Sequence, residues 1–222
     1  MKTALLAGAS GLVGSRLLRL VLDDPGYERV TALVRRGLPL QHKKLVQREI
    51  DFEMLAELGN VPRADDVFCC LGTTMKQAGS REAFYRVDCT YVHELARLAA
   101  AQRARQFLLV SALGANPRSR IFYNRVKGEV EEAVKRIAFE SIHIFRPSFL
   151  TGPRAERRLG ERIAIPLFRA LSPLMIGPLR RSRPIPAETV ARAIVRVARK
   201  AQRGVHVYPS DQIAALGDAE RA

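Results

Sequence analysis

The chain has 222 residues, of which 47% are apolar and 27% charged, and its formal net charge is +15. This length fits one α/β domain with a sizeable core, and the composition excludes a disordered chain. There is no apolar run of the roughly 18 residues that could span a bilayer and no signal peptide ahead of the first predicted strand, so we expect a cytoplasmic protein.

The chain begins with an apolar stretch of strand length, residues 2–7, and a turn that contains Gly8, Gly11 and Gly14. An amphipathic helix is predicted over 12–22. Gly8 permits a tight turn, Gly11 lets the backbone approach a ligand, and Gly14 lets the helix pack closely on the strand. Because the N–H groups at a helix start attract phosphate, this G-x-x-G-x-x-G turn predicts a dinucleotide site.

The second predicted strand, residues 30–34, ends directly before Arg35 and Arg36. In a dinucleotide-binding fold the residue at this place meets the adenosine ribose, where a carboxylate binds the 2′-hydroxyl and an arginine pairs with a 2′-phosphate. No carboxylate is present here. Arg35 therefore favours NADP(H) over NAD(H), whereas Arg36 is equally well explained as surface charge.

Two further strands are predicted over 45–50 and 66–71, and the residues that end them are candidates for cofactor contacts. By position, Asp51 would border the adenine. The residues that would pass under the ribose and pyrophosphate are Leu71, Gly72 and Thr73.

The rest of the pattern alternates helices and strands, with a long helix over 80–103, a strand over 107–111, a second long helix over 119–136 and a strand over 141–145. This rhythm predicts an α/β fold with a doubly wound, mostly parallel sheet and helices on both faces. We expect one Rossmann domain that spans the whole chain, residues 1–222.

The pattern changes after Gly152. A stretch rich in Pro, Arg and Leu, residues 153–186, is expected to form a small basic lobe that faces substrate or partner. A helix is predicted over 187–201 and a last strand over 205–208. The tail from residue 211 is expected to be loosely held.

Lys and Arg residues are concentrated between residues 146 and 203. Such a region could bind an anionic substrate, an acidic protein or a membrane surface, or it could be an ordinary solvated face. Nucleic acid is not favoured, because the arginines are not interleaved with aromatic residues and no nucleic-acid-binding motif is present.

The cysteines and histidines do not have the spacing of a metal site. Cys69, Cys70 and Cys89 are an odd number, and the first two lie in an apolar run where buried thiols are common. The four histidines are far apart in the sequence. We therefore predict core thiols and no metal.

A candidate catalytic group consists of Ser111, at the end of the fifth predicted strand, with Tyr123 and Lys127 on the following helix. Residues four apart share one face of a helix, so Lys127 can stabilise the phenolate of Tyr123. Tyr123 would then exchange a proton with a substrate oxygen that Ser111 holds by a hydrogen bond. A Y-x-x-x-K pair alone is also explained by simple packing on a helix.

With these residues in place, the chain resembles the short-chain dehydrogenase/reductases, in their atypical branch, and most of all the subgroup typified by the Tat-interacting tumour-suppressor oxidoreductase. The likeness rests on residues 68–74, 111–116, 123–129 and 145–147 and extends to about residue 201. It implies a Rossmann fold, a catalytic triad of Ser111, Tyr123 and Lys127, and NADPH as cofactor. The implied cofactor contacts are Gly8, Ser10, Gly11, Leu12, Val13, Gly14 and Arg35, with a nicotinamide contact at Ser148, Phe149 and Leu150.

One departure concerns the asparagine that many members of this family carry on the helix after the fourth strand. It has no clear counterpart here, and Asp88 is its nearest substitute. The resemblance also implies that a bound cofactor does not guarantee catalysis, because some relatives act through protein partners.

Three functions follow from these observations. The first is an NADP(H)-dependent oxidoreductase that acts on a small carbonyl or alcohol substrate, with Arg154, Arg157 and Arg158 holding an anionic group. The second is a non-catalytic NADPH-binding regulatory or scaffold protein whose basic surface docks an acidic protein or a membrane. The third is an epimerase or dehydratase with tightly held NAD, against which Arg35 argues. Analogy with the fold suggests a homodimer.

Overall fold

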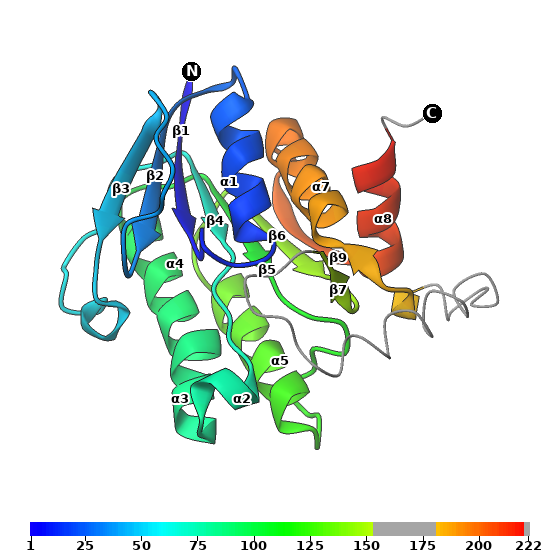
Figure 1. Ribbon diagram of the computed structural model, residues 1–222. Coiled ribbons are helices and arrows are strands. Elements are labelled where there is room, and N and C mark those ends of the chain that lie inside the picture. Colours follow the sequence, from blue (N-terminus) through cyan, green and yellow to red (C-terminus); the bar gives the residue numbers. More distant parts are fainter. Residues whose placement is uncertain (153–180, 220–222) are drawn as a thin grey trace.

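The computed structural model describes residues 1–152 and 181–219 (Figure 1). The strands are β1 (Lys2–Ala7), β2 (Tyr27–Val34), β3 (Leu45–Glu49), β4 (Asp66–Cys69), β5 (Gln106–Val110), β6 (Ser141–Arg146), β7 (Leu150–Thr151), β8 (Ile185–Pro186) and β9 (Gly204–Pro209). The α-helices are α1 (Gly14–Asp23), α2 (Met75–Ala78), α3 (Arg81–Tyr85), α4 (Tyr91–Ala101), α5 (Phe122–Lys135), α7 (Ala187–Lys200) and α8 (Ser210–Asp218). A 3₁₀ turn, η1 (Phe52–Met54), and a π-helical turn, η2 (Arg86–Thr90), complete the set of described elements.

Seven strands form one parallel sheet in the order β3-β2-β1-β4-β5-β6-β9. The chain leaves β1 toward β2 and later returns to β4 on the other side of β1. The connections therefore diverge between β1 and β4, at the sheet edge where parallel strands end and ligands of such folds bind. The doubly wound sheet predicted from the sequence is confirmed.

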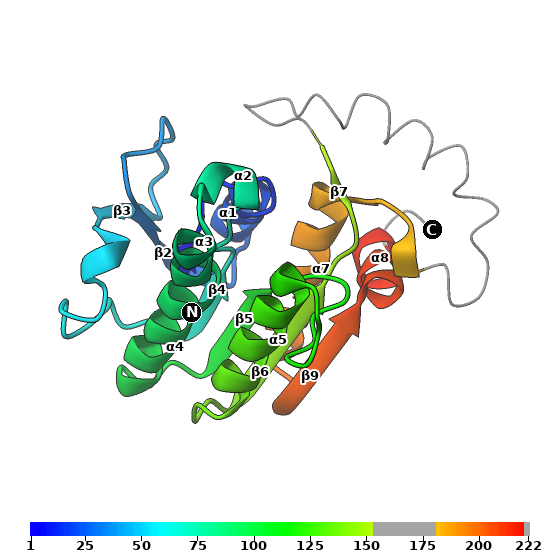
Figure 2. The ribbon, with the colours of Figure 1, turned by 90° about the horizontal axis from the view of Figure 1, so that it is seen from below.

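Helices cover both faces of the sheet, with α1, α7 and α8 on one side and α4 and α5 on the other (Figure 2). Their apolar residues recur at helical spacing and are turned toward the strands. On α5 the fully buried stripe is Val126, Val130 and Val134. Because both faces of the sheet are covered, most of the side chains of its central strands are apolar and buried.

The long helix predicted over 80–103 is divided. The Ser80 hydroxyl accepts a hydrogen bond from the Ala83 N–H at 3.1 Å and so begins α3. The π-helical turn η2 then separates α3 from α4 and buries Asp88 and Cys89. A π turn inserts an extra residue and changes which side chains face inward, an effect that helical periodicity alone does not reveal.

The prediction that the tail from residue 211 is loosely held is wrong. Residues 210–218 form α8, whose Ile213 is fully buried against the core on the α7 side. The Arg192 guanidinium of α7 donates a hydrogen bond to the Gly217 carbonyl at 2.9 Å. Helix α8 is stable because it packs on α7, not because its short sequence favours a helix.

Most of the predicted basic lobe, including Arg154, Arg157 and Arg158, lies outside the described residues. Of that stretch, the structure describes 181–186, which ends in β8, and β8 pairs with β7 in a separate parallel sheet of two strands. Across the described part of the chain, none of the helices has both the length and the apolar character needed to cross a membrane.

Candidate functional site

The turn after β1 is built from backbone that excludes side chains. Gly8 has φ +85°, a conformation that favours glycine, and a Cβ on it would lie 2.4 Å from the Cys70 carbonyl oxygen. A Cβ on Gly14, the first residue of α1, would lie 2.1 Å from the Gly8 oxygen. Helix α1 has no side-chain cap and no acidic residue in its first turn, so its N-terminus suits an anion such as the phosphate of a dinucleotide.

The loop after β4, residues 70–74, connects this turn to the rest of the site. Its Leu71 nitrogen would lie 2.9 Å from a Cβ on Gly8. A Cβ on Gly72 would lie 3.4 Å from Asp88 Oδ1 and 3.7 Å from Lys127 Nζ. The structure therefore brings Leu71 and Gly72 between the glycine turn and α5.

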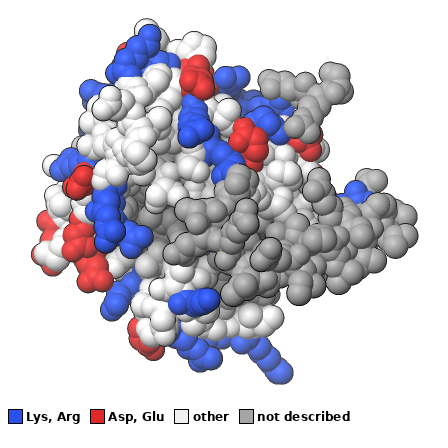
Figure 3. All heavy atoms as spheres, viewed as in Figure 1, with Lys and Arg blue, Asp and Glu red and all other residues white. Residues whose placement is uncertain are grey.

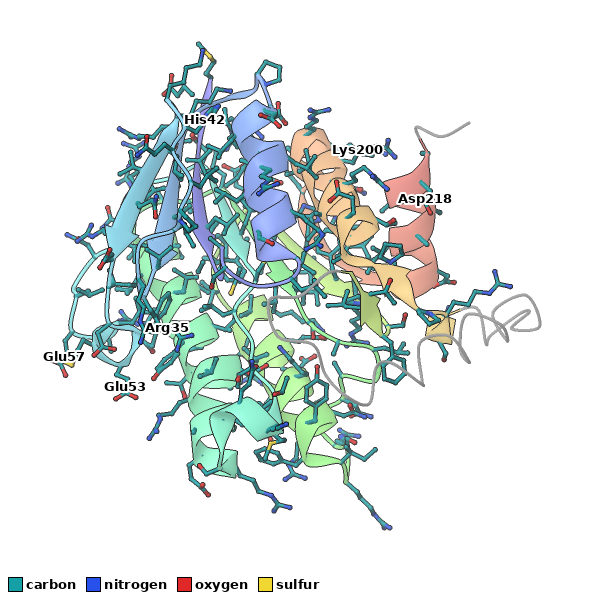
Figure 4. The ribbon with its side chains drawn as sticks, in the orientation of Figure 1. Arg35, His42, Glu53, Glu57, Lys200 and Asp218 are labelled. Carbon is teal, nitrogen blue, oxygen red and sulfur yellow. The ribbon has the colours of Figure 1, made fainter. Side chains whose placement is uncertain are left out.

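Arg35 lies directly after β2 with an exposed side chain, at the same sheet edge as the glycine turn (Figure 4). Asp51 has a local role in this structure, because its Oδ1 accepts a hydrogen bond from the Glu53 N–H at 2.9 Å and caps η1. Asp51 therefore has a structural role as the cap of η1, in addition to its predicted contact with adenine.

Lys127 is buried on α5, and its counter-ion is Asp88. Lys127 Nζ lies 2.8 Å from Asp88 Oδ1, and the two side chains are only 6% and 1% exposed. Asp88 Oδ2 accepts a hydrogen bond from the Thr73 N–H at 2.8 Å, which ties the β4 loop to the pair. Burial alone would lower the pKa of Lys127, but the Asp88 carboxylate, together with Tyr123 and Cys69, offsets that effect and the pKa is raised. The buried ammonium is thus paired with a carboxylate.

Tyr123 lies one helical turn before Lys127 and is 36% exposed. Its ring packs on Phe84 of α3, with ring centroids 5.6 Å apart. The phenol is close enough to Lys127 to add to the rise in that lysine's pKa, after the larger effects of burial and Asp88. The structure therefore places a solvent-accessible tyrosine beside a buried cation.

Ser111 is buried after β5, and its hydroxyl meets a residue that the sequence analysis missed. Ser111 Oγ donates a hydrogen bond to Glu131 Oε1 at 2.5 Å, and Glu131 is fully buried. Arg146 Nε donates to both Glu131 oxygens at 3.0 and 3.1 Å, and its Nη2 also donates to Oε2. The hydrogen bond to Glu131 raises the pKa of Arg146.

The sequence did contain a sign of Glu131. It follows Lys127 by one helical turn and lies on the same side of α5 as the buried valines, where an unpaired carboxylate would be costly. A carboxylate on the buried face of an amphipathic helix predicts a buried cationic partner. Arg146, which ends β6, is that partner.

The segment after β6 is held by hydroxyl groups. The Ser148 N–H donates to Ser210 Oγ at 3.1 Å, and Ser210 Oγ donates to Ser148 Oγ at 3.1 Å. Ser148 Oγ in turn donates to the Arg183 carbonyl. Phe149 is 65% exposed, and Leu150 pairs with Ile185 in the small sheet. The predicted nicotinamide contact therefore lies on a fixed backbone with an exposed aromatic ring.

Two features outside the site are the cysteines and the distribution of charge on the surface. The cysteines are free thiols, and Cys69 and Cys89 are buried, which confirms core thiols for these two. Burial raises the pKa of Cys69 to about 12. On the face shown in Figure 3, Lys and Arg side chains are spread among Asp and Glu and do not form one patch within the described surface.

The family described as the NAD dependent epimerase/dehydratase family matches residues 4–209. The chain is 39% identical over 174 residues to protein HTATIP2 of Rattus norvegicus, across 77% of this chain and 72% of that protein. It is 30% identical over 227 residues to the mitochondrial protein fmp52 of Aspergillus fumigatus, across 99% and 97% of the two chains. These relatives confirm the resemblance to the Tat-interacting subgroup.

Solved structures share the fold at low identity. WbmH of Bordetella bronchiseptica, solved with NAD⁺, has a TM-score of 0.70 at 18% identity and covers 99% of this chain and 80% of its own. The human epimerase family protein SDR39U1, solved with NADPH, has a TM-score of 0.64 at 16% identity over 97% and 80% of the two chains.

The prediction of a cytoplasmic location is wrong on these comparisons. Several fungal relatives, among them the FMP52 proteins of Aspergillus fumigatus and Eremothecium gossypii, are named mitochondrial. The prediction depended largely on composition. Composition does not determine in which compartment a folded protein is found.

Proposed function

The chain belongs to the NAD dependent epimerase/dehydratase family, and from that premise we propose that it is an NADP(H)-dependent oxidoreductase that transfers hydride between nicotinamide and a carbonyl/alcohol substrate. The observation that supports this most strongly is the buried Lys127 ammonium. It lies between Tyr123 on α5 and the β4 loop that contacts the glycine turn.

The described residues fit a dinucleotide. The turn at Gly8 and Gly14 leaves no room for a Cβ, and the uncapped start of α1 is suited to the pyrophosphate. Arg35 would pair with a 2′-phosphate, and the backbone of Ser148 to Leu150 would border the nicotinamide. When bound, the nicotinamide would give or accept the hydride, and the protein's residues would bind and orient the substrate and transfer the proton.

In this mechanism, Tyr123 exchanges a proton with the substrate oxygen. A free tyrosine is a weak acid at neutral pH, so this role requires a cation close to the phenol, and Lys127 lies one helical turn away on α5. Asp88 keeps Lys127 charged and fixes its position relative to the β4 loop. Ser111 orients the substrate oxygen through a hydrogen bond.

Replacing Tyr123 by phenylalanine tests this proposal. We expect Tyr123→Phe to lower kcat by about 100-fold or more while cofactor affinity is retained, because only the transferable proton is lost. Tyr85→Phe, at a similarly exposed tyrosine of α3, is the matched control and should keep full turnover. Full turnover by Tyr123→Phe on a panel of aldehydes, ketones and alcohols would contradict the role of Tyr123.

The cofactor preference has a separate test. We expect the protein to bind NADPH at least about tenfold more tightly than NADH, and Arg35→Asp to remove the difference. Arg29→Asp makes the same charge change at the start of β2, on the opposite sheet edge, and should leave the preference intact. Equal affinity of the parent protein for both cofactors would contradict the NADP(H) assignment.

A second candidate is an epimerase or dehydratase that retains its cofactor, which the family description favours. Such an enzyme would not exchange cofactor with solvent during turnover. Dialysis followed by mass spectrometry of the denatured protein distinguishes the two, because a retained NAD⁺ supports the epimerase. Cofactor binding without turnover of any substrate in the panel would instead support the regulatory protein, with an acidic protein or a membrane surface as its partner.

A further inference from the structure

A buried chain of hydrogen bonds leads from Ser111 to Arg146 through Glu131. Ser111 is 6% exposed, and its hydroxyl donates to Glu131 Oε1 at 2.5 Å. Glu131 is held on its other side by Arg146, whose Nε lies within 3.1 Å of both carboxylate oxygens. The three residues come from β6, α5 and the end of β5, so the sheet and the helix both fix the arrangement.

The direction of the Ser111 hydrogen bond follows from the chemistry of its partner. A carboxylate has no hydrogen to donate, so Ser111 must be the donor. A serine hydroxyl has a single hydrogen, and the bond to Glu131 uses it. Ser111 Oγ therefore has only lone pairs to offer a substrate. The Arg146 guanidinium stabilises this arrangement, because its N–H groups pair with both Glu131 oxygens and fix their orientation.

We propose that Glu131 is a positioning residue that makes Ser111 a hydrogen-bond acceptor, so that the resting site binds its substrate as an alcohol in preference to a carbonyl. An alcohol O–H donates to Ser111 Oγ, whereas a carbonyl oxygen has nothing to donate. To bind a carbonyl, Ser111 must first give up its charge-assisted hydrogen bond to Glu131. This inference rests on the proposed function for the site itself, but it concerns binding and not the rate of hydride transfer.

Glu131→Gln should change the direction of this hydrogen bond. The Arg146 N–H groups face the side chain, so they hold the amide oxygen and turn the amide NH₂ toward Ser111. Ser111 then accepts from Gln and has its own hydrogen free for a carbonyl. Glu132→Gln is the matched control, because Glu132 is the next residue on α5 and forms a surface ion pair with Lys135 at 2.7 Å.

The measurement is the affinity for matched alcohol and ketone pairs, such as cyclohexanol and cyclohexanone or 1-phenylethanol and acetophenone. These are titrated by calorimetry into protein saturated with a tetrahydronicotinamide analogue of its preferred cofactor, which cannot transfer hydride. We expect the parent and Glu132→Gln to bind each alcohol about tenfold or more tightly than its ketone. Glu131→Gln should reduce this ratio below about threefold or reverse it.

Ser111→Ala provides a second variant in case Glu131→Gln fails to fold, because it leaves the pair of Glu131 and Arg146 in place. It should also remove the preference for alcohols. An equal or stronger affinity of the parent for ketones, an unchanged ratio in these variants, or no binding of any alcohol would overturn the inference. The affinities are measured on complexes that cannot react. A lack of turnover in a separate assay would therefore contradict the proposed function but would not change the ratio of affinities.

Discussion

The turn after β1 and the inner face of α5 border the same edge of the sheet, but they are built differently. The turn is backbone, and Gly8 and Gly14 keep it free of side chains. The face of α5 is built from charges, with Lys127 paired to Asp88 and Glu131 paired to Arg146. The turn after β1 therefore defines the shape of the backbone. The inner face of α5 defines which buried groups carry charge and which hydrogen bonds they form.

This difference determines how each region responds to substitution. In the glycine turn any added carbon collides with backbone that cannot move away, so the size of the new side chain matters more than its polarity. In the α5 region the loss of one partner leaves an uncompensated buried charge, while the loss of both partners is better tolerated. Three experiments examine this contrast.

The largest effect is expected for Gly8→Ala. The new Cβ would lie 2.4 Å from the Cys70 oxygen at a residue with φ +85°. We expect a loss of roughly 4 kcal/mol in the free energy of unfolding and no detectable cofactor binding, from steric overlap and backbone strain together. Urea denaturation and NADPH fluorescence titration measure the two effects.

Gly79→Ala is the control for backbone strain, because Gly79 has φ +78° and no atom lies within 4 Å of its would-be Cβ. It should cost only about 1 kcal/mol. Gly8→Ala could lower the free energy of unfolding by no more than Gly79→Ala does. That result would show that the close contact between the turn after β1 and the loop after β4 does not contribute to stability, and that the turn is not defined by shape.

The next effect is expected for Asp88→Asn, which leaves the Lys127 ammonium buried without a counter-charge. We expect a loss of about 3 kcal/mol in the free energy of unfolding. The pKa of Lys127 should fall, since burial is no longer offset. The double variant Asp88→Asn, Lys127→Met should recover much of the stability in urea denaturation.

Glu94→Gln serves as the surface control for this experiment, because Glu94 pairs with the half-exposed Arg97 at 2.9 Å. An exposed pair of this kind should contribute less than about 1 kcal/mol. A double variant as unstable as Asp88→Asn alone would show that the α5 region depends on packing and not on its charges.

The smallest effect concerns His143, a buried base on β6 that has no acidic partner among the described residues. Its Nδ1 lies 3.1 Å from the Tyr208 hydroxyl, and burial, with His206 beside it, lowers its pKa to about 4. In the unfolded chain histidine has a pKa of about 6.5, so between this pH and pH 4 the unfolded chain binds a proton at His143 that the folded chain does not bind. Stability from this group is therefore present above about pH 6.5 and is lost as the pH falls toward 4.

His143→Phe should flatten this acid dependence by on the order of 2 kcal/mol between pH 6.5 and 4, measured by urea denaturation at several pH values. An identical pH profile for the parent and His143→Phe would contradict the lowered pKa. Burial acts in the same direction on Lys127, but there the Asp88 carboxylate opposes it and the pKa is raised.

Much of the fold and part of the site could be predicted from the sequence. Alternating apolar strands and amphipathic helices indicated the parallel sheet, and the spacing of Gly8, Gly11 and Gly14 indicated the turn after β1. Tyr123 and Lys127 were found because four residues make about one turn of a helix. Each of these features depends on residues close together in the chain, where periodicity is informative.

Glu131, Arg146 and the pairing of Asp88 with Lys127 depended on contacts between distant segments. The tertiary structure decided them, because a parallel sheet brings the ends of sequentially distant strands to one edge, and burial there selects the partner of each charge. The same reason explains α8, which exists through its contact with α7. By itself the sequence determined most of the helices and strands and the candidate site residues Tyr123 and Lys127, while packing determined which charge faces which and which group accepts the hydrogen bond of Ser111.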